Sequence, residues 1–384
     1  MKILFYDMGS YTYHDFLHYL KKAGHACKTV YYHFPDKFQD EFFCERFSMH
    51  LTDGAYDVVM SVNFFPLVAQ LCDKHHIRYI SWCYDSPMEE RLQDYFSYET
   101  NYIFLFDRIE ALQYRAAGYT RVFHLPLAVN TERLDALNPH PSPAFTYRAD
   151  VSFVGNLYHS PLETLLYSAD DYVKGYIEGI LQAQLRIYGC YLLDDLITDD
   201  LLNAINSSFS KIGQTDLNLN RRGLSYAIAT KITHLERCFL LEQCGELFDT
   251  RFYSSKACEL NHVKACGPVK YEEEMPLVFR YSKLNLCPTL KCIQSGIPLR
   301  ALDIMGAQGV LLSNYQPELA EYFENEKDMI LYDSMEDAIA KAAFYLKQDD
   351  LRNKIALNGY RKVKEHFTYP QRIREMFDIA GINR

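Results

Sequence analysis

The chain has 384 residues, of which 48% are hydrophobic and 23% are charged. At roughly 150 residues per domain, this length predicts about two and a half domains, and the apolar content is enough for two cores. The composition excludes a disordered chain and a small disulfide-bonded protein. No uninterrupted apolar stretch approaches the roughly 20 residues that a membrane-spanning helix requires, so no membrane span is expected.

The net charge is -10 and is spread evenly along the chain. When the chain is divided at residue 140, the first part has 13 Lys and Arg against 18 Asp and Glu, and the second part has 27 against 32. Neither part is basic, so the sequence predicts no nucleic-acid partner and no module for anionic lipids. The aromatic content is unusual, with 31 Tyr and 24 Phe against one Trp, and the sequence does not explain the Tyr excess.

The first residues, MKILFYD, contain an apolar run that is too short for a secretory signal and is followed at once by Asp7. The 11 Cys are scattered singly and form no C-x-x-C pair, which predicts reduced thiols in the cytoplasm. His75 and His76 end a predicted helix, but no carboxylate or Cys lies at a metal-ligand spacing from them. No metal site is therefore expected.

The first 137 residues alternate short apolar runs with helical stretches. Several of these runs are almost continuously apolar, as expected for strands whose sheet is covered on both faces. The repeated strand–helix–strand pattern predicts a doubly wound α/β domain over residues 1–137. Strands are expected at Lys2–Tyr6, Lys28–His33, Asp57–Asn63, Arg78–Tyr84, Tyr102–Phe106 and Val122–Leu127, with helices at His14–Ala23, Phe65–His75 and Ile109–Ala117.

Residues 138–150, NPHPSPAFTYRAD, carry three prolines within five positions and predict a linker. A second doubly wound domain is expected over 151–370, followed by a tail helix over 371–384. Residues 162–248 are mostly helical in period and predict a helical insert after the first strand of this domain. The expected elements are strands at Val151–Asn156, Arg251–Ser254, Val263–Ala265, Leu284–Cys287, Gly309–Ser313 and Met329–Tyr332, and helices at Met335–Leu346 and Asp350–His366, the last capped by Asp350.

Ligands of doubly wound sheets bind beyond the carboxyl ends of the strands, and two such domains predict a cleft. In WCYDSP, Asp85 follows a buried strand and precedes the turn at Pro87, where its carboxylate would orient or deprotonate an acceptor hydroxyl. Capping of the next helix by Asp85 remains an open alternative. Gly9, Ser10 and His14 follow the first strand and are acceptor-side candidates, although a structural role is favoured for His14. DMGSYTY lacks G-x-G-x-x-G, so no dinucleotide site is expected there.

The strongest local pattern is QSGIPLRALDIMGAQGVLLSN, residues 294–314. It predicts a loop containing Gly296, a helix that starts at Pro298, and a buried strand. Gly296 would let a ligand approach the backbone, and the N–H groups at the helix start favour phosphate. Arg300 would add a bidentate phosphate contact, and Asp303 on the same face would accept ribose hydroxyls. A strand–helix packing turn with an Arg–Asp surface pair fits the same residues.

This segment resembles the donor-binding signature of retaining GT-B glycosyltransferases, P-x-x-x-x-[E/D]-x-M-x-x-x-G. More closely, GIPLRALDIMGAQG resembles the spore-maturation, CgeB-like branch, in which the Arg and the acid belong to G-x-P-x-R-x-x-[E/D]-x-M. The strand VSFVGN and the closing region, residues 318–373, are similar too, so the resemblance covers about residues 150–375. It implies a GT-B fold, with two Rossmann-like doubly wound domains facing a cleft and a helical insertion in the C-terminal domain.

The resemblance further implies transfer of a sugar from a nucleotide diphosphate sugar, with UDP favoured, to a hydroxyl of a protein, glycan or small molecule. It implies retention of configuration and neither a catalytic metal nor a cofactor besides the donor. Arg300 would stabilise the leaving diphosphate, and Asp85 would act on the acceptor. The implied donor-binding residues are Gly155 and Asn156 near the pyrophosphate, Gly267 and Pro268 near the nucleobase with Tyr271 as a stacking candidate, and Gly296, Ile297, Pro298, Arg300 and Asp303.

One position departs from the retaining superfamily. Better-known members place a Glu eight residues before the ribose-binding acid, where this chain has Ser295. The CgeB-like branch commonly lacks that Glu, so the departure bears on the sugar more than on the fold. Two alternatives stay open: a nucleotide-sugar epimerase of the same fold, which needs carboxylates acting on the sugar ring, and a non-catalytic nucleotide-sugar-binding homologue.

Overall fold

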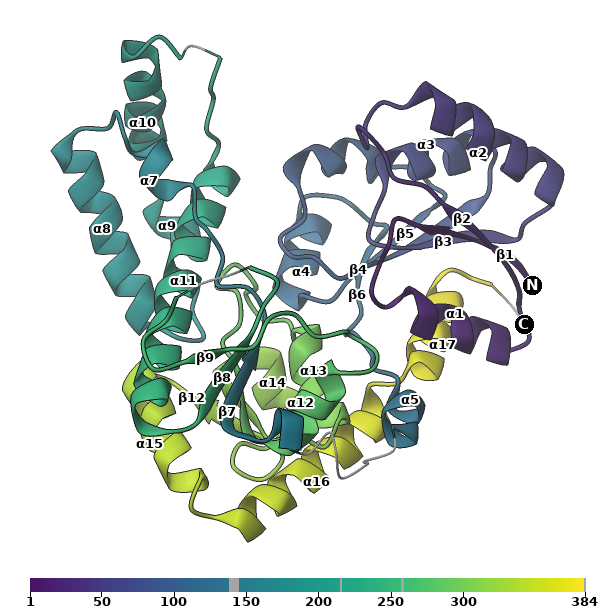
Figure 1. Cartoon of the computed structure of the whole chain (residues 1–384). Coiled ribbons are helices and arrows are strands. Elements are labelled where there is room, and N and C mark those ends of the chain that lie inside the picture. The colour runs from purple at the N-terminus through teal and green to yellow at the C-terminus, as the bar shows by residue number, and fades with distance from the viewer. Residues whose placement is uncertain (138–144, 215, 257–258, 383–384) are drawn as a thin grey trace. The chain divides into compact units, whose positions relative to one another are not determined.

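A computed structural model describes residues 1–137, 145–214, 216–256 and 259–382 (Figure 1). It has two six-stranded parallel sheets that alternate with helices, so the predicted α/β class is confirmed. The chain divides into a first unit of Met1–Glu132, Ser295–Leu302 and Val363–Arg384 and a second unit of Arg133–Gln294 and Asp303–Lys362. This division is not linear along the chain, unlike the predicted domains. Residues 138–144 of the predicted linker lie outside the described residues.

The sheet of the first unit has the strand order β2-β1-β3-β4-β5-β6, and every pair in it is parallel. Each strand overlaps a predicted one. The chain reverses its direction of progress across the sheet between β1 and β3, which is where doubly wound sheets bind ligands. The strands are β1 (Lys2–Asp7), β2 (Ala26–Tyr31), β3 (Val58–Val62), β4 (Arg78–Cys83), β5 (Asn101–Leu105) and β6 (Val122–His124).

Helices connect these strands, as the alternating pattern predicted. The four helices between them are α1 (Tyr13–Lys22), α2 (Glu41–Gly54), α3 (Pro66–Lys74) and α4 (Arg108–Ala116), with a 3-10 helix at Glu90–Tyr95. Helix α17 (Tyr369–Ile379) near the C-terminus also packs in this unit, where its Tyr369 ring stacks on Tyr19 of α1 with the ring centroids 5.5 Å apart. Helix α5 (Thr131–Ala136) spans the boundary of the two units.

Tyrosines contribute strongly to the core of the first unit. The Tyr6 ring lies 4.8 Å from that of Phe65 between centroids, and its hydroxyl donates to the Tyr32 carbonyl at 2.7 Å. Tyr79 is fully buried and its hydroxyl lies 2.7 Å from that of Ser61. A buried tyrosine needs such a partner for its hydroxyl, and these have one. Part of the Tyr excess is therefore core material and not a property of a ligand cleft.

The sheet of the second unit has the order β12-β11-β10-β7-β8-β9, also parallel throughout. Its reversal point lies between β7 and β10. The strands are β7 (Ala149–Val154), β8 (Thr250–Tyr253), β9 (Lys264–Ala265), β10 (Ser282–Cys287), β11 (Leu311–Asn314) and β12 (Ile330–Tyr332). The helices after β9 are α12 (Met275–Tyr281), α13 (Leu299–Gly306), α14 (Pro317–Tyr322), α15 (Met335–Tyr345) and α16 (Asp349–His366), of which α13 and α16 span the boundary of the units.

The predicted helical insert is confirmed between β7 and β8 (Figure 1). It consists of α7 (Leu162–Leu165), α8 (Asp171–Arg186), α9 (Leu193–Leu196), α10 (Asp199–Lys211) and the long α11 (Arg221–Leu247). The insert has its own apolar core, to which α11 contributes Leu224 and Ile228. Further along, α11 contributes Leu240 and Cys244 to the core beneath the second sheet. One helix thus belongs to two cores.

The predicted cap at Asp350 is wrong. Helix α16 begins at Asp349, so Asp350 lies inside its first turn, where the side chain of an N-cap residue does not belong. The Asp349 carboxylate pairs with Arg352 one turn later. Acidic residues at this helix start remain favourable because the N-terminal end of a helix carries partial positive charge.

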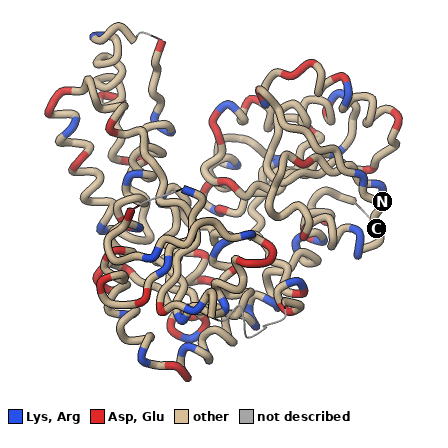
Figure 2. The backbone as a smooth tube through the Cα atoms, in the orientation of Figure 1, with Lys and Arg blue, Asp and Glu red and all other residues tan. Residues whose placement is uncertain are grey.

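Charged residues of both signs are interspersed along the backbone in each unit (Figure 2). This mixture agrees with the even charge of the sequence. Among the described residues, no helix is both long and apolar enough to cross a membrane. Because charges of both signs are mixed in each unit, recognition of a phosphate by this chain has to come from local groups.

Candidate functional site

Asp85 follows β4 at the carboxyl edge of the first sheet, as predicted. The Asn63 amide, which follows the neighbouring strand β3, donates to the Asp85 carboxylate at 2.7 Å. The carbonyl oxygen of the same amide accepts the Tyr84 backbone N–H at 2.7 Å. Asn63 has a positive φ of 65°, which Asn tolerates better than most residues. Asn63 thus fixes the position of Asp85 relative to the ends of β3 and β4.

The surroundings of Asp85 change its acidity. Loss of water around the carboxylate raises its pKa above the usual 3.8, although the hydrogen bond from Asn63 and the charge of Lys37 act in the opposite direction. The alternative role as a helix cap is not seen, because the residue that precedes the 3-10 helix is Glu89. The Asp85 carboxylate accepts from the Asn63 side chain instead. A carboxylate with a raised pKa at the ligand-binding edge of a sheet suits proton transfer.

The three acceptor-side candidates lie where the first strand ends. Gly9 is exposed, and the Ser10 backbone N–H donates to the Asp7 carboxylate at 3.0 Å. The Ser10 hydroxyl lies 3.0 Å from that of Thr12. His14 lies in the first turn of α1 with an exposed side chain. Strands β1, β3 and β4 are parallel neighbours. Gly9, Ser10, His14 and Asp85, which follow β1 and β4, therefore lie at the same edge of the sheet.

The 294–314 segment forms the predicted loop, helix and strand. Pro298 directly precedes α13, and Ile297 is buried. The close approach at Gly296 is made by protein: a Cβ atom there would lie 2.8 Å from the Phe106 ring and 2.9 Å from the Asp107 Cα. The absence of a side chain at Gly296 is therefore required by packing against the end of β5.

Ser295, at the position where better-known relatives have Glu, is buried in the first unit. Its hydroxyl donates to the Asp107 carboxylate at 2.8 Å. The same carboxylate caps α4 by accepting the Ile109 and Glu110 backbone N–H groups. Ser295 and Asp107 therefore join the segment that carries Gly296 to the start of α4.

Asp303 lies on the next turn of α13 after Arg300 and is 4% exposed. This burial excludes an Arg–Asp surface pair. The Tyr271 hydroxyl donates to the Asp303 carboxylate at 3.0 Å, and the Arg133 guanidinium lies 5.6 Å from the centre of the Tyr271 ring. Arg300 is half-buried in the first turn of the helix. Tyr271 thus brings the segment after Gly267 and Pro268 to the face of α13 on which Asp303 lies.

Gly155 and Asn156 follow β7 at the reversal point of the second sheet, and the Gly155 N–H donates to the Tyr253 carbonyl at 3.0 Å. The Asn156 side chain is exposed, and its oxygen accepts from the Ser254 hydroxyl at 3.5 Å. Gly267 follows β9 with a positive φ of 72°, and Pro268 is exposed. Strands β7, β8 and β9 are neighbours in a parallel sheet. Gly155, Asn156, Gly267 and Pro268 therefore lie at the same edge of the sheet, where the segment that leads to Tyr271 begins.

Arg237 of α11 is a residue that the sequence analysis missed. It is 8% exposed, and its guanidinium donates to the Pro288 carbonyl through Nε at 3.2 Å and Nη2 at 2.6 Å. Nη1 donates to the Asn156 carbonyl. Asn156 follows β7 and Pro288 follows β10, the two strands that flank the reversal point. One buried side chain therefore holds together both loops at the expected ligand-binding position of the second sheet.

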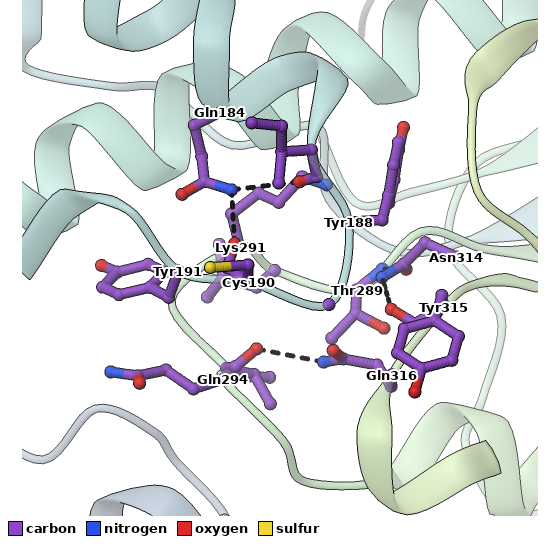
Figure 3. Close-up of a pocket in the computed structure, with 14 residues that line it drawn as sticks. Gln184, Tyr188, Cys190, Tyr191, Thr289, Lys291, Gln294, Asn314, Tyr315 and Gln316 are labelled. Atoms are coloured by element: carbon purple, nitrogen blue, oxygen red, sulfur yellow. Dashed lines mark hydrogen bonds between the residues drawn. The ribbon is translucent and has the colours of Figure 1, made fainter.

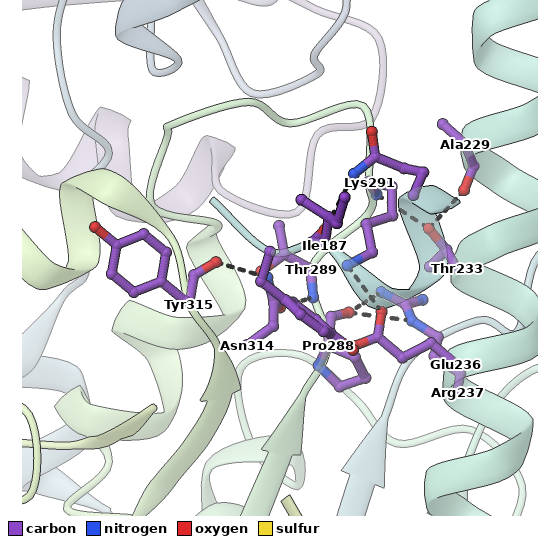
Figure 4. A network of polar contacts seen from close by, with 12 residues as sticks. Ile187, Ala229, Thr233, Glu236, Arg237, Pro288, Thr289, Lys291, Asn314 and Tyr315 are labelled. Atoms are coloured by element: carbon purple, nitrogen blue, oxygen red, sulfur yellow. Dashed lines mark hydrogen bonds and ion pairs between the residues drawn. The ribbon is translucent and has the colours of Figure 1, made fainter. Parts of the chain in front are cut away.

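A second missed feature is a buried ion pair beside Arg237 (Figure 4). The Lys291 ammonium lies 3.5 Å from the carboxylate of Glu236, which is fully buried. Glu236 also accepts from the Tyr188 and Tyr332 hydroxyls at 2.9 and 3.0 Å. Burial lowers the pKa of Lys291, while Glu236 opposes this shift. The only available sequence signal was the presence of charged residues within apolar runs, HLERCFLL and NLCPTLKC.

The described residues contain no group of three or more His, Cys, Asp and Glu side chains arranged to hold a metal ion. The ten cysteines among them form no disulfide. His75 and His76 directly follow α3, which ends at Lys74.

Comparison with known proteins finds a family match over part of the chain. Residues 237–378, a little over a third of the chain, match a family model described as glycosyl transferase-like. No curated protein matches the sequence. The matched range contains Arg237, Lys291 and Asp303, together with all of α13.

Solved structures are similar over almost the whole chain. A glycosyltransferase from Rickettsia africae ESF-5 has 9% identity and a TM-score of 0.57, covering 99% of this chain and 97% of that one. The sucrose-phosphate synthase of Thermosynechococcus elongatus has 10% identity and a TM-score of 0.54, with coverage of 99% and 98%. Anabaena Alr3699/HepE in complex with UDP and glucose has 10% identity and a TM-score of 0.53, with 99% of each chain covered. At this identity the similarity shows the fold, which is the GT-B fold of glycosyltransferases, and residues 237–378 correspond to the glycosyl transferase-like family.

Proposed function

We propose that this protein is a glycosyltransferase that moves a sugar from a nucleotide diphosphate sugar to a hydroxyl acceptor. The observation that carries the proposal is the buried Asp303 carboxylate, held by Tyr271 on a short helix within the segment that matches the glycosyl transferase-like family. The GT-B fold supports it. UDP is the favoured nucleotide, because the similar Anabaena structure contains UDP and glucose.

In this proposal, the N–H groups at the start of α13 and the Arg300 guanidinium bind the donor diphosphate, and Asp303 accepts ribose hydroxyls. Gly155, Asn156, Gly267 and Pro268 complete the donor site. Positive charge at the diphosphate stabilises the negative charge that develops on the leaving group, which is the main requirement of this chemistry. Transfer then proceeds with retention and without a catalytic metal, and the transferred group is a hexose.

Asp85 is proposed to act on the acceptor. Its raised pKa favours uptake of a proton from a hydroxyl, and Asn63 fixes its position. Gly9, Ser10 and His14 share this edge of the first sheet and would contact the acceptor. The motif G-I-P-L-R-A-L-D-I-M supports assignment to the CgeB-like branch, and the scattered single cysteines, none of them in a C-x-x-C pair, support a cytoplasmic location.

Calorimetric titration with UDP, GDP and dTDP tests the donor site. We expect one of them to bind, and Asp303→Ala to weaken that binding at least tenfold, which is about 1.4 kcal/mol. Exposed Asp333→Ala, in the same unit, is the control and leaves the affinity unchanged. Equal affinity of Asp303→Ala and wild type would refute the donor assignment.

An assay with nucleotide sugars separates the proposed activity from its alternatives. A transferase releases the nucleoside diphosphate and forms an acceptor-linked or hydrolysed sugar, whereas an epimerase returns an isomeric nucleotide sugar. A binding protein gives neither product while still binding the nucleotide. Formation of the isomer, or binding without turnover, would replace the proposal by the corresponding alternative.

A further inference from the structure

A polar pocket of the second unit lies at the carboxyl ends of β10 and β11, against the segment that follows α8 (Figure 3). It encloses about 330 Å³ not filled by protein atoms, its opening to solvent included. Among its lining residues are Thr289, Lys291, Gln184, Gln294 and Gln316.

Most amide groups around the pocket are occupied by the protein itself. The Gln184 amide donates to the Ile187 and Cys190 carbonyls, and the Gln316 amide donates to the Ile293 carbonyl at 3.0 Å. These bonds fix the walls of the pocket. The groups that remain for a ligand must therefore come from other side chains.

The Thr289 hydroxyl is such a group. Thr289 is 3% exposed, and its hydroxyl oxygen has no hydrogen-bond partner among the described residues. Its backbone N–H is bound by the Asn314 side chain at 2.7 Å, so the residue is held in place. Leaving a buried hydroxyl unpaired costs about 1–3 kcal/mol, and because Thr289 lines the pocket, a molecule in the pocket can supply the missing partner.

Lys291 adds a charge to the same pocket. Its ammonium is held by Glu236 at 3.5 Å and lies 3.7 Å from the centre of the Tyr188 ring. An ammonium has three N–H groups, and these contacts leave donor capacity for a ligand. The Lys291–Glu236 pair as a whole is neutral, because the carboxylate of the fully buried Glu236 balances the charge of the ammonium.

This charge balance distinguishes between two ligand chemistries. A phosphate would place a second negative charge beside the buried Glu236, where water does not screen the repulsion. A neutral hydroxyl oxygen accepts from Lys291 and exchanges a hydrogen bond with Thr289 without this cost. The pocket therefore favours hydroxyl groups.

Thr289 and Lys291 lie on the connection from β10 to α13. The other end of this connection carries Pro298, Arg300 and the start of the helix proposed to bind the donor diphosphate. In a nucleotide sugar, the transferred sugar is attached directly to that diphosphate. A hydroxyl-binding pocket on the same connection is thus in the right part of the chain to receive the sugar.

We infer that Thr289 and Lys291 bind hydroxyl groups of the transferred sugar and contribute to its selection. This inference rests on the proposed function. A pocket built to hydrogen-bond a hydroxyl discriminates strongly against ligands that lack it, because its own polar groups are then left unpaired. Glu236 acts through Lys291 as a positioning residue.

Calorimetry on the full chain tests the inference. The ligands are the nucleoside diphosphate that wild type binds most tightly among UDP, GDP and dTDP, and its conjugates with glucose, mannose and N-acetylglucosamine. We expect at least one conjugate to bind more tightly than the free nucleotide. Thr289→Val should weaken this conjugate at least tenfold and leave the affinity of the free nucleotide within twofold of wild type. Thr289→Ser keeps a hydroxyl and should behave as wild type, which a purely structural role of the Thr289 side chain would not predict.

Ser282→Ala is the matched control. Ser282 begins β10 at the opposite edge of the same sheet, and its hydroxyl is also buried without a hydrogen-bond partner among the described residues. This variant should bind every ligand as wild type does. If Thr289→Val lowers both affinities equally, or if no conjugate binds more tightly than the nucleotide, the inference is overturned while the proposed function stands. If wild type binds no nucleotide at all, the proposed function fails and the inference falls with it.

Discussion

Replacement of Lys291 by Met tests the physical account of the Glu236–Lys291 pair. The two side chains are 0% and 7% exposed, and the substitution leaves the Glu236 carboxylate without its cation inside the protein. Removing one partner of a buried pair costs about 3–5 kcal/mol, because the remaining charge loses its compensation. The Tyr188 and Tyr332 hydroxyls still donate to Glu236, so we expect a loss near the lower end of this range, about 3 kcal/mol.

Differential scanning calorimetry measures this loss. For a unit of about 200 residues, 1 kcal/mol shifts Tm by roughly 2–4 °C, so the transition of the second unit should fall by about 6–12 °C. The control is Lys283→Met, because Lys283 forms an ion pair with Asp150 at 2.8 Å in the same unit with both side chains partly exposed. Such pairs contribute about 0–1 kcal/mol, so this transition should move by at most about 4 °C.

The double variant Lys291→Met with Glu236→Gln separates charge from packing. Gln keeps an oxygen that accepts from the two tyrosines but carries no charge, so the double variant should recover more than half of the lost stability. The reasoning is refuted if Lys291→Met melts within 2 °C of wild type, or if the double variant is no more stable than the single one. The second result would assign the loss to packing of the lysine stem.

Other predictions concern the remaining polar groups. Asn63→Ala removes a hydrogen bond to the charged form of Asp85, so the pKa of Asp85 should rise further and the acid limb of the pH–rate profile should move to higher pH; an unchanged limb would show that Asp85 is not the titrating group. Arg237→Lys cannot reach both carbonyls, and we expect denaturant unfolding to show a loss of about 2 kcal/mol and calorimetry to show weaker nucleotide binding. Sugar transfer should persist in EDTA, and its loss with recovery on adding Mg²⁺ would refute metal independence.

The positions of the strands were predictable because each is a short apolar run between polar turns. Residues Arg78–Tyr84 were expected to form a strand, and β4 covers Arg78–Cys83. This strand was predictable because both of its faces are covered, which requires an almost continuous apolar run. The cap at Asp350 failed because the acidic residue before it, Asp349, already lies in the helix. Helix boundaries depend on local competition between neighbouring residues, and the sequence pattern does not resolve a shift of one residue.

The partners of the candidate residues were less predictable. Asp303 and Tyr271 are 32 positions apart, so their hydrogen bond depends on the folded chain. Gly296 was predicted to admit a ligand, whereas the space beside it is filled by Phe106 and Asp107, nearly 190 positions earlier in the chain. Arg237 and Lys291 were missed because charged residues in apolar runs reveal burial but not which groups they bind.

The position of the helical insert has a consequence for the order of folding. Strands β7 and β8 pair directly, with Val151 opposite Thr250, so about a hundred residues separate the two members of this parallel pair. Closing a flexible loop of that length costs conformational entropy that grows with the logarithm of the loop length, and such distant pairing slows folding. The insert has its own apolar core, and we expect it to form first, since a folded insert leaves a much shorter flexible connection to close. Helix α11 then reaches from that core to the sheet, where its Leu240 and Cys244 side chains meet β7 and β8 as they pair.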